Sequence, residues 1–97
     1  MSQSIRYSNL SIDPEARRAY RDSPGIRLSP RETSILSLFL AHPGEVLALR
    51  EIRFLGFEGQ EISDNSIRVH IHALRRKLGL PYLIHTVRGV GYVLREK

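Results

Sequence analysis

The stretch from Asp64 to Leu78 constrains the fold more than any other, because its apolar residues recur at the spacing of a helix. They are separated by four, three and four positions, which aligns them along one side of a helix: Ile67, Ile71, Leu74 and Leu78. The opposite side is basic and carries no acid after Asp64. We therefore predict a helix over 64–78 whose aliphatic side packs on a core and whose cationic side is exposed.

Residues that start and stop helices mark both ends of this stretch. Asp64 stands where an N-cap belongs, and its negative charge suits the positive end of the helix dipole. Gly79 and Pro81 follow Leu78 and stop the helix there. The predicted helix therefore has well-marked bounds.

The net charge of +5 is concentrated in the last third of the chain. Residues 1–63 contain eight arginines and eight acids, which cancel, whereas residues 64–97 contain seven Lys or Arg and two acids. A positive excess confined to one segment indicates a polyanion-binding surface. Nucleic acid is favoured over an anionic membrane, because no amphipathic segment has the bulky aromatic face of an interfacial helix.

A helix of this kind suits the major groove of duplex DNA, where facing side chains must be short enough for close approach and cationic enough to meet phosphate. Ser66, Val69 and Ala73 are the short groups. The competing interpretation is the solvated basic side of an ordinary helix, which is what charge runs usually are. Features elsewhere in the chain decide between the two.

Composition excludes several other classes of protein. A chain of 97 residues suffices for one domain, and the absence of cysteine excludes disulfides and thiolate metal sites. No apolar run approaches the roughly 18 residues of a membrane span, and the first seven residues lack the apolar core of a signal peptide, so we expect a cytoplasmic chain. His70 and His72 diverge by about 200° around the predicted helix, so one metal ion cannot bind both. We expect neither an enzyme nor a metal or other cofactor.

The first 28 residues favour strands over helices. Short alternating apolar stretches lie between turn formers such as Asp13-Pro14 and the segment from Asp22 to Gly25. Residues 15–21 are compatible with a helix or a strand, and the flanking turns and Tyr20 favour a strand around 18–21. We therefore predict short antiparallel strands in this part of the chain.

Two helices are predicted before the basic one. Ser29 as N-cap, a proline at the first helical position and Glu32 three residues after Ser29 form a capping box, and the aliphatic helix that follows ends at His42-Pro43-Gly44. The segment from Val46 to Phe54 predicts a second, shorter helix, and Leu55 to Ser63 predicts a loop. This order is typical of a helix-turn-helix arrangement, although the loop is longer than the usual turn.

Two β-rich runs after Pro81 predict a hairpin. They flank the tetrad Arg88-Gly89-Val90-Gly91, whose glycines serve the turn. A phosphate-cradling role for Gly-x-Gly is not supported, because no helix follows it. An arginine at a protruding tip beside a groove-reading helix is placed to enter the neighbouring minor groove, and Arg88 has that position.

Three sequence blocks together resemble the OmpR/PhoB-type winged-helix DNA-binding domain of bacterial two-component response regulators. They are Leu28-Ser29-Pro30-Arg31-Glu32, Ile67-x-Val69-His70-Ile71-x-x-Leu74-Arg75-x-Lys77-Leu78, and Ile84-x-Thr86-Val87-Arg88-Gly89-Val90-Gly91-Tyr92. The resemblance implies an α+β fold, a winged helix-turn-helix with an N-terminal antiparallel sheet over about 4–28, a three-helix bundle over about 30–78 and a C-terminal β-hairpin wing over about 82–95. Residues 1–97 are then a single such domain, with no receiver domain present.

The resemblance also implies a function, which is sequence-specific binding of double-stranded DNA as the effector domain of a transcriptional regulator. The residues at positions that meet base edges are Ser66, Arg68, Val69 and Ala73. The residues near phosphates are Asn65, His70, His72, Arg75 and Arg76, and Arg88 enters the minor groove. Family members typically bind direct repeats as head-to-tail pairs of copies. Their loop after the second helix often touches RNA polymerase, and its residues here are Phe57, Glu58, Gln60 and Glu61.

The chain departs from the family pattern at three places. Many relatives have an acid where Arg68 stands and an arginine where Ala73 stands, so their base preference does not transfer. The tryptophan common near the end of the second helix is absent, and Phe54 or Phe57 is the nearest substitute.

The alternative function is a winged-helix protein-interaction module without DNA binding, but such a module has no reason to concentrate positive charge after Asp64.

Overall fold

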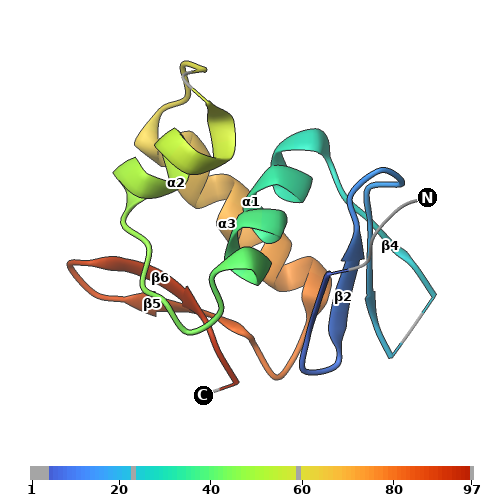
Figure 1. Ribbon diagram of the computed structural model, residues 1–97. Coiled ribbons are helices and arrows are strands. Elements are labelled where there is room, and N and C mark those ends of the chain that lie inside the picture. The colour runs from blue at the N-terminus through green and yellow to red at the C-terminus, as the bar shows by residue number, and fades with distance from the viewer. Residues whose placement is uncertain (1–4, 23, 59, 97) are drawn as a thin grey trace.

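The computed structural model describes residues 5–22, 24–58 and 60–96. A four-stranded antiparallel sheet comes first, three helices follow, and a two-stranded hairpin comes last (Figure 1). The elements are β1 (Ile5–Tyr7), β2 (Leu10–Asp13), β3 (Arg18–Arg21), β4 (Ile26–Arg27), α1 (Pro30–Ala41), α2 (Leu49–Phe57), α3 (Asp64–Leu78), β5 (Ile84–Val87) and β6 (Gly91–Leu94). The sheet and the hairpin lie at opposite ends of the helices. The predicted α+β order of sheet, three helices and hairpin is confirmed.

The N-terminal sheet is a simple meander in the order β1-β2-β3-β4. Its alternating residues divide into two faces, because successive side chains of a strand point to opposite sides. Leu10, Ile12 and Ala19 are fully buried on the inner face, whereas Tyr20 is exposed on the outer face. Residues 18–21, which were compatible with either a helix or a strand, form β3 as favoured.

Helix α1 begins as its sequence predicts. The hydroxyl of Ser29 accepts a hydrogen bond from the backbone N–H of Glu32 at 3.1 Å, and the carboxylate of Glu32 accepts one from the backbone N–H of Ser29 at 2.9 Å. This reciprocal pair satisfies two of the N–H groups that a helix start leaves without partners. Ile35, Leu36 and Phe39 are fully buried, so α1 lies at the centre of the core.

Helix α2 begins three residues later than predicted, at Leu49 in place of Val46. Tertiary pairing explains the shift, because Leu47 exchanges two backbone hydrogen bonds with Tyr92 of the hairpin, at 2.8 and 2.9 Å. Residues that pair with a strand are extended and cannot start a helix. The helix continues to Phe57, and Glu58, with a φ of +44°, ends it. The loop therefore begins at Glu58 and not at Leu55 as predicted.

Helix α3 has the predicted bounds, and its predicted stripe is buried: Ile67, Ile71, Leu74 and Leu78. Its N-cap, however, is Ser63, whose hydroxyl accepts from the backbone N–H of Ser66 at 3.0 Å. The prediction of Asp64 as N-cap is therefore wrong by one residue. Asp64 is the first helical residue, where its charge still faces the positive end of the helix dipole.

Candidate nucleic-acid interface

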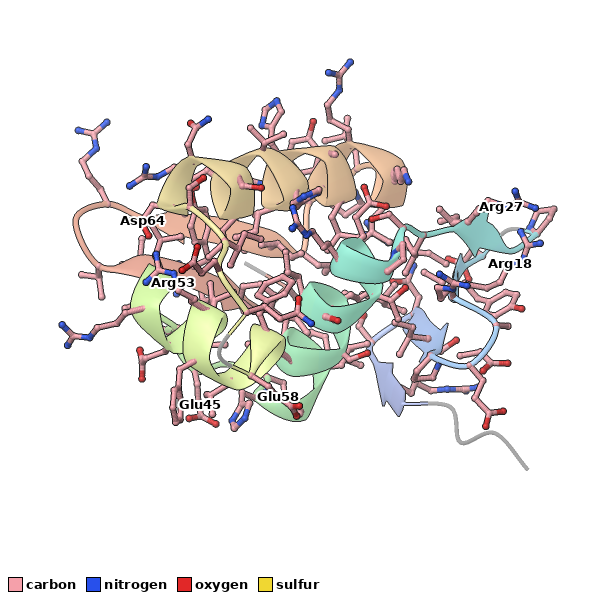
Figure 2. The ribbon with its side chains drawn as sticks, turned by 90° about the horizontal axis from the view of Figure 1, so that it is seen from above. Arg18, Arg27, Glu45, Arg53, Glu58 and Asp64 are labelled. Carbon is pink, nitrogen blue, oxygen red and sulfur yellow. The ribbon has the colours of Figure 1, made fainter. Side chains whose placement is uncertain are left out.

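The exposed side of α3 gathers the residues that the sequence predicts to meet DNA. Of these, Asn65, Arg68, His72 and Arg76 are exposed, and Ser66, His70 and Ala73 are half-buried. Val69, an apolar residue in the middle of this helix, is 56% exposed. Figure 2 shows side chains projecting from α3 on the side that faces away from α1 and α2. The structure therefore presents one exposed surface with cations around a short apolar centre.

A groove separates this surface from the hairpin. One part, about 340 Å³, is lined by Arg68, Val69, His72 and residues of both hairpin strands, including Thr86 and Tyr92. A second part, about 330 Å³, is lined by Arg68 together with the hairpin tip at Gly89 and Val90. Arg68 lines both parts, so α3 and the tip of the hairpin form one concave surface.

The hairpin tip carries Arg88 as predicted. Val87 pairs with Gly91 at the end of the ladder, and Arg88 is exposed in the turn that joins β5 to β6. Gly89 has a φ of +76°, a backbone conformation that glycine adopts without a steric penalty. The turn therefore projects an arginine beside the exposed side of α3.

Arg75, which is predicted to lie near a phosphate, has partners within the protein. Its Nε donates to the carbonyl of Ile84 at 2.9 Å, and its Nη2 donates to the hydroxyl of Thr86 at 3.0 Å. Its guanidinium also lies 5.9 Å from the ring centroid of Tyr82. These contacts hold β5 against α3, so Arg75 also orients the hairpin.

The loop between α2 and α3 exposes Glu58, Gln60 and Glu61. Phe57 is a correction, because it is the last residue of α2 and only 3% exposed, with its ring in the core. Phe54 is instead 75% exposed and lines a hollow of about 750 Å³ with residues of this loop. The aromatic group available to a partner is therefore Phe54.

Arg53 fastens this loop to the start of α3. Its Nε donates to the carbonyl of Ile62 at 3.1 Å, and its guanidinium forms an ion pair with Asp64, labelled with it in Figure 2. Asp64 thus contributes to the position of α3 through a side-chain contact as well as through the helix dipole. Its partner on α2 could not be identified from the sequence.

Arg21 holds the other end of α3 and was missed by the sequence analysis. Its side chain is 9% exposed and donates to three carbonyls just where α3 ends: Leu78 at 3.2 Å, Gly79 at 2.8 Å and Pro81 at 2.5 Å. A cation at a helix C-terminus meets the negative end of the dipole and the carbonyls without helical partners. The alternation of β3 was a usable signal, because it puts Arg21 on the same face as Ala19.

Lys77 and Glu32 connect α3 to α1. The Lys77 ammonium donates to the carboxylate of Glu32 at 2.6 Å and to the carbonyl of Arg27 at 3.2 Å. Burial by itself raises the pKa of the Glu32 carboxyl. The hydrogen bond and the charge of Lys77, together with the hydrogen bonds to Ser29, outweigh burial, so the pKa is lowered overall. Glu32 is therefore held ionised while it joins the two helices.

This lowered pKa predicts a pH dependence of stability. A carboxyl whose pKa is lower in the folded state adds stability above its unfolded pKa, near 4.5, and that stability is lost as the pH falls through the folded pKa. We expect Glu32→Gln to reduce the free energy of unfolding at pH 7 by about 1–2 kcal/mol and to flatten its decline below pH 4.5. Urea unfolding at several pH values measures both effects. Glu45→Gln, at an exposed carboxylate, is the matched control, and an equal response of the two variants would contradict this role of Glu32.

Across 5–22, 24–58 and 60–96, no group of three or more His, Asp or Glu side chains is arranged to hold a metal ion. Over the same ranges, no helix combines the length and hydropathy needed to cross a lipid bilayer.

Comparison with known proteins identifies similar domains. A family model described as "Transcriptional regulatory protein, C terminal" matches residues 22–94. The response regulator MprA of Mycobacterium tuberculosis is 42% identical over 100 residues, covering 98% of this chain and 43% of MprA. The chain therefore spans less than half the length of this curated relative.

Two solved structures have the same fold. The DNA-binding domain of Escherichia coli CadC superposes with a TM-score of 0.86 at 26% identity, over 97% of this chain and 94% of that one. The DNA-binding domain of Klebsiella pneumoniae RstA, solved in complex with the RstA box, superposes with a TM-score of 0.80 at 28% identity, over 96% and 97%. The winged-helix fold implied by the sequence resemblance is confirmed.

Proposed function

This chain belongs to the family of transcriptional regulatory protein C-terminal domains, the OmpR/PhoB-type winged-helix domains of response regulators, and on that premise we propose that it binds double-stranded DNA as the effector domain of a transcriptional regulator. One observation carries the proposal. The exposed side of α3 places cations around the small side chains Val69 and Ala73, next to a hairpin tip that carries Arg88. The solved DNA complex of the similar RstA domain supports the same partner.

In the proposed complex α3 lies in the major groove. Ser66, Arg68, Val69 and Ala73 meet base edges, where Arg68 can donate two hydrogen bonds to a guanine and Val69 can contact a thymine methyl group. Phosphates are bound by a second set of residues: Asn65, His70, His72, Arg75 and Arg76. Arg88 enters the adjacent minor groove, where its charge is favoured. Phosphate contacts supply affinity and register, and base contacts supply sequence preference.

The proposal also covers where the domain acts, how copies of it are arranged on DNA and which protein it contacts. Residues 1–97 act as one DNA-binding domain in the cytoplasm, and two copies bind direct repeats head to tail. Copies on the same face of the duplex require half-sites about one helical turn, 10–11 bp, apart. The loop residues Glu58, Gln60 and Glu61, with Phe54 beside them, form the surface offered to RNA polymerase, and their exposure supports that role.

Fluorescence anisotropy with labelled duplexes tests DNA binding directly. Sites selected from random duplexes should bind more tightly than random sequence, and affinity should fall steeply as salt rises, because phosphate contacts release counterions. No binding at about 50 mM salt, where phosphate contacts are strong, would reject the proposal. That result would favour the alternative, a protein-interaction module, which the concentration of exposed cations on α3 otherwise disfavours.

Arg68→Ala tests the assignment of base contacts. We expect it to cost about 1–3 kcal/mol of binding free energy at the selected site and much less on random duplex, if Arg68 donates to a guanine. Arg76→Ala is the comparison, because loss of a phosphate contact should weaken both duplexes equally and reduce the salt slope by about one unit. Equal losses on both duplexes for Arg68→Ala would reassign this residue to the DNA backbone.

A further inference from the structure

Arg31, in the first turn of α1, lies beside the exposed side of α3 but has no part in the interface described above. Its Nη1 donates to the hydroxyl of Ser66 at 3.4 Å. Arg31 is exposed, and none of the described carboxylates lies within ion-pair distance of its guanidinium. A hydrogen bond of this length is weak, and a guanidinium has five N–H donors, so most of its capacity to bind an acceptor remains available.

The local structure of α1 gives the charge of Arg31 no stabilising role. The first turn of a helix is the positive end of its dipole, where an acid is favourable and a cation is unfavourable. Glu32 supplies the acid and completes the capping box, whereas Arg31 adds a positive charge next to it. An anionic partner from outside the chain would compensate this charge.

Ser66 identifies the flank of α3 that Arg31 faces. Ser66 and Arg68 are two residues apart, so they diverge by about 200° around the helix. Arg68 lines the groove beside the hairpin, and Ser66 and Arg31 therefore lie on the other flank. Lys77 shares this flank, but its ammonium donates to the Glu32 carboxylate at 2.6 Å. Arg31 thus adds an uncompensated positive charge where the lysine of α3 is already paired.

A helix in the major groove has a sugar-phosphate backbone on each flank, because a helix with its side chains is about 10–12 Å across and the groove is about 12 Å wide. We propose that Arg31 binds a phosphate of the DNA strand on the flank away from the hairpin, which adds the start of α1 to the DNA-binding surface. A guanidinium matches the oxygens of a phosphate in geometry as well as in charge. This inference rests on the proposed DNA-binding function and adds a contact from outside α3 and the hairpin.

The test measures the binding of Arg31→Gln to a duplex with one selected site, so that contacts between copies do not enter, and to a random duplex. Glutamine removes the charge and keeps a polar side chain. Arg6→Gln is the control, because Arg6 is also exposed but lies on β1, at the opposite edge of the sheet from β4, whose Arg27 carbonyl accepts from Lys77 of α3. Urea unfolding checks the fold, and loss of a cation from the first turn of α1 should leave the midpoint unchanged or slightly higher.

At about 0.1 M salt we expect Arg31→Gln to bind both duplexes roughly fivefold to tenfold more weakly than the unchanged chain, with a salt slope smaller by about one unit. Arg6→Gln should match the unchanged chain on both. The same loss should appear when Arg31→Gln is combined with Ser66→Ala and compared with Ser66→Ala alone, because a phosphate contact does not need the hydroxyl.

Unchanged affinity and salt slope in Arg31→Gln would overturn the inference while leaving the proposed function intact. A loss that disappears in the Ser66→Ala background would assign Arg31 to the orientation of the Ser66 hydroxyl and also overturn it. Absence of DNA binding by the unchanged chain would reject both proposals.

Discussion

Gly91→Ala is expected to detach the hairpin from the helices and to lower the free energy of unfolding by about 3 kcal/mol or more. A Cβ at this position would lie 2.0 Å from the carbonyl oxygen of Leu47 and 2.9 Å from Cα of Ala48. Both are backbone atoms, so no side-chain rotation relieves the clash. The hairpin must move, and the two backbone hydrogen bonds that join Leu47 and Tyr92 are lost with it.

Gly89→Ala is the matched control for this prediction. Gly89 lies two residues away, and its positive φ costs alanine about 1 kcal/mol, but a Cβ there meets no atom within 4 Å. Chemical denaturation measures both variants, and equal losses would show that the backbone contact at Gly91 is not what holds the hairpin. DNA affinity should fall more in Gly91→Ala, because the arginine at the displaced tip no longer lies beside α3.

Arg21→Met is the second large prediction, and it concerns the end of α3. Methionine keeps the apolar stem of the side chain but removes the hydrogen bonds to Leu78, Gly79 and Pro81. Hydrogen bonds to charged groups contribute about 1.5–3 kcal/mol each, and water can reach part of this region, so we expect a total loss of about 3 kcal/mol. For a domain of this size the melting temperature should then fall by more than about 10 °C.

The control for Arg21→Met is Arg27→Met, an exposed arginine on the neighbouring strand. We expect it to change the free energy of unfolding by less than about 0.5 kcal/mol. Hydrogen exchange adds a local measurement, since loss of protection in Arg21→Met should be largest in the last turn of α3. A melting temperature within 2 °C or so of the unchanged chain would show that the buried guanidinium adds little net stability.

The two helices with the strongest local signals could be predicted closely from the sequence. The capping box at Ser29 and Glu32 and the apolar stripe of α3 depend on residues at most a few turns apart, so local rules apply. The surface of α3 follows from the same stripe, because burying one side of a helix exposes the other. The candidate site on α3 was therefore visible in the sequence before its surroundings were known.

Apart from the N-cap of α3, which is Ser63 in place of Asp64, the differences from the prediction come from contacts between residues far apart in the chain. Pairing with Tyr92 extends Leu47 and shifts the start of α2. Burial in the core removes Phe57 from the loop surface and leaves Phe54 exposed. Contacts with β5 give Arg75 a role in orienting the hairpin that the sequence did not indicate.

The amino-acid sequence by itself determined which segments become helices and strands, which side of α3 is apolar, and where positive charge accumulates. These properties come from side-chain chemistry and from the periods of the helix and the strand, so a linear pattern suffices. Only the tertiary structure decided which arginines are available to a polyanion and which hold the fold together. Arg21 has the same side chain as Arg68 and Arg88, and only the nearby carbonyls supplied by a distant segment distinguish it.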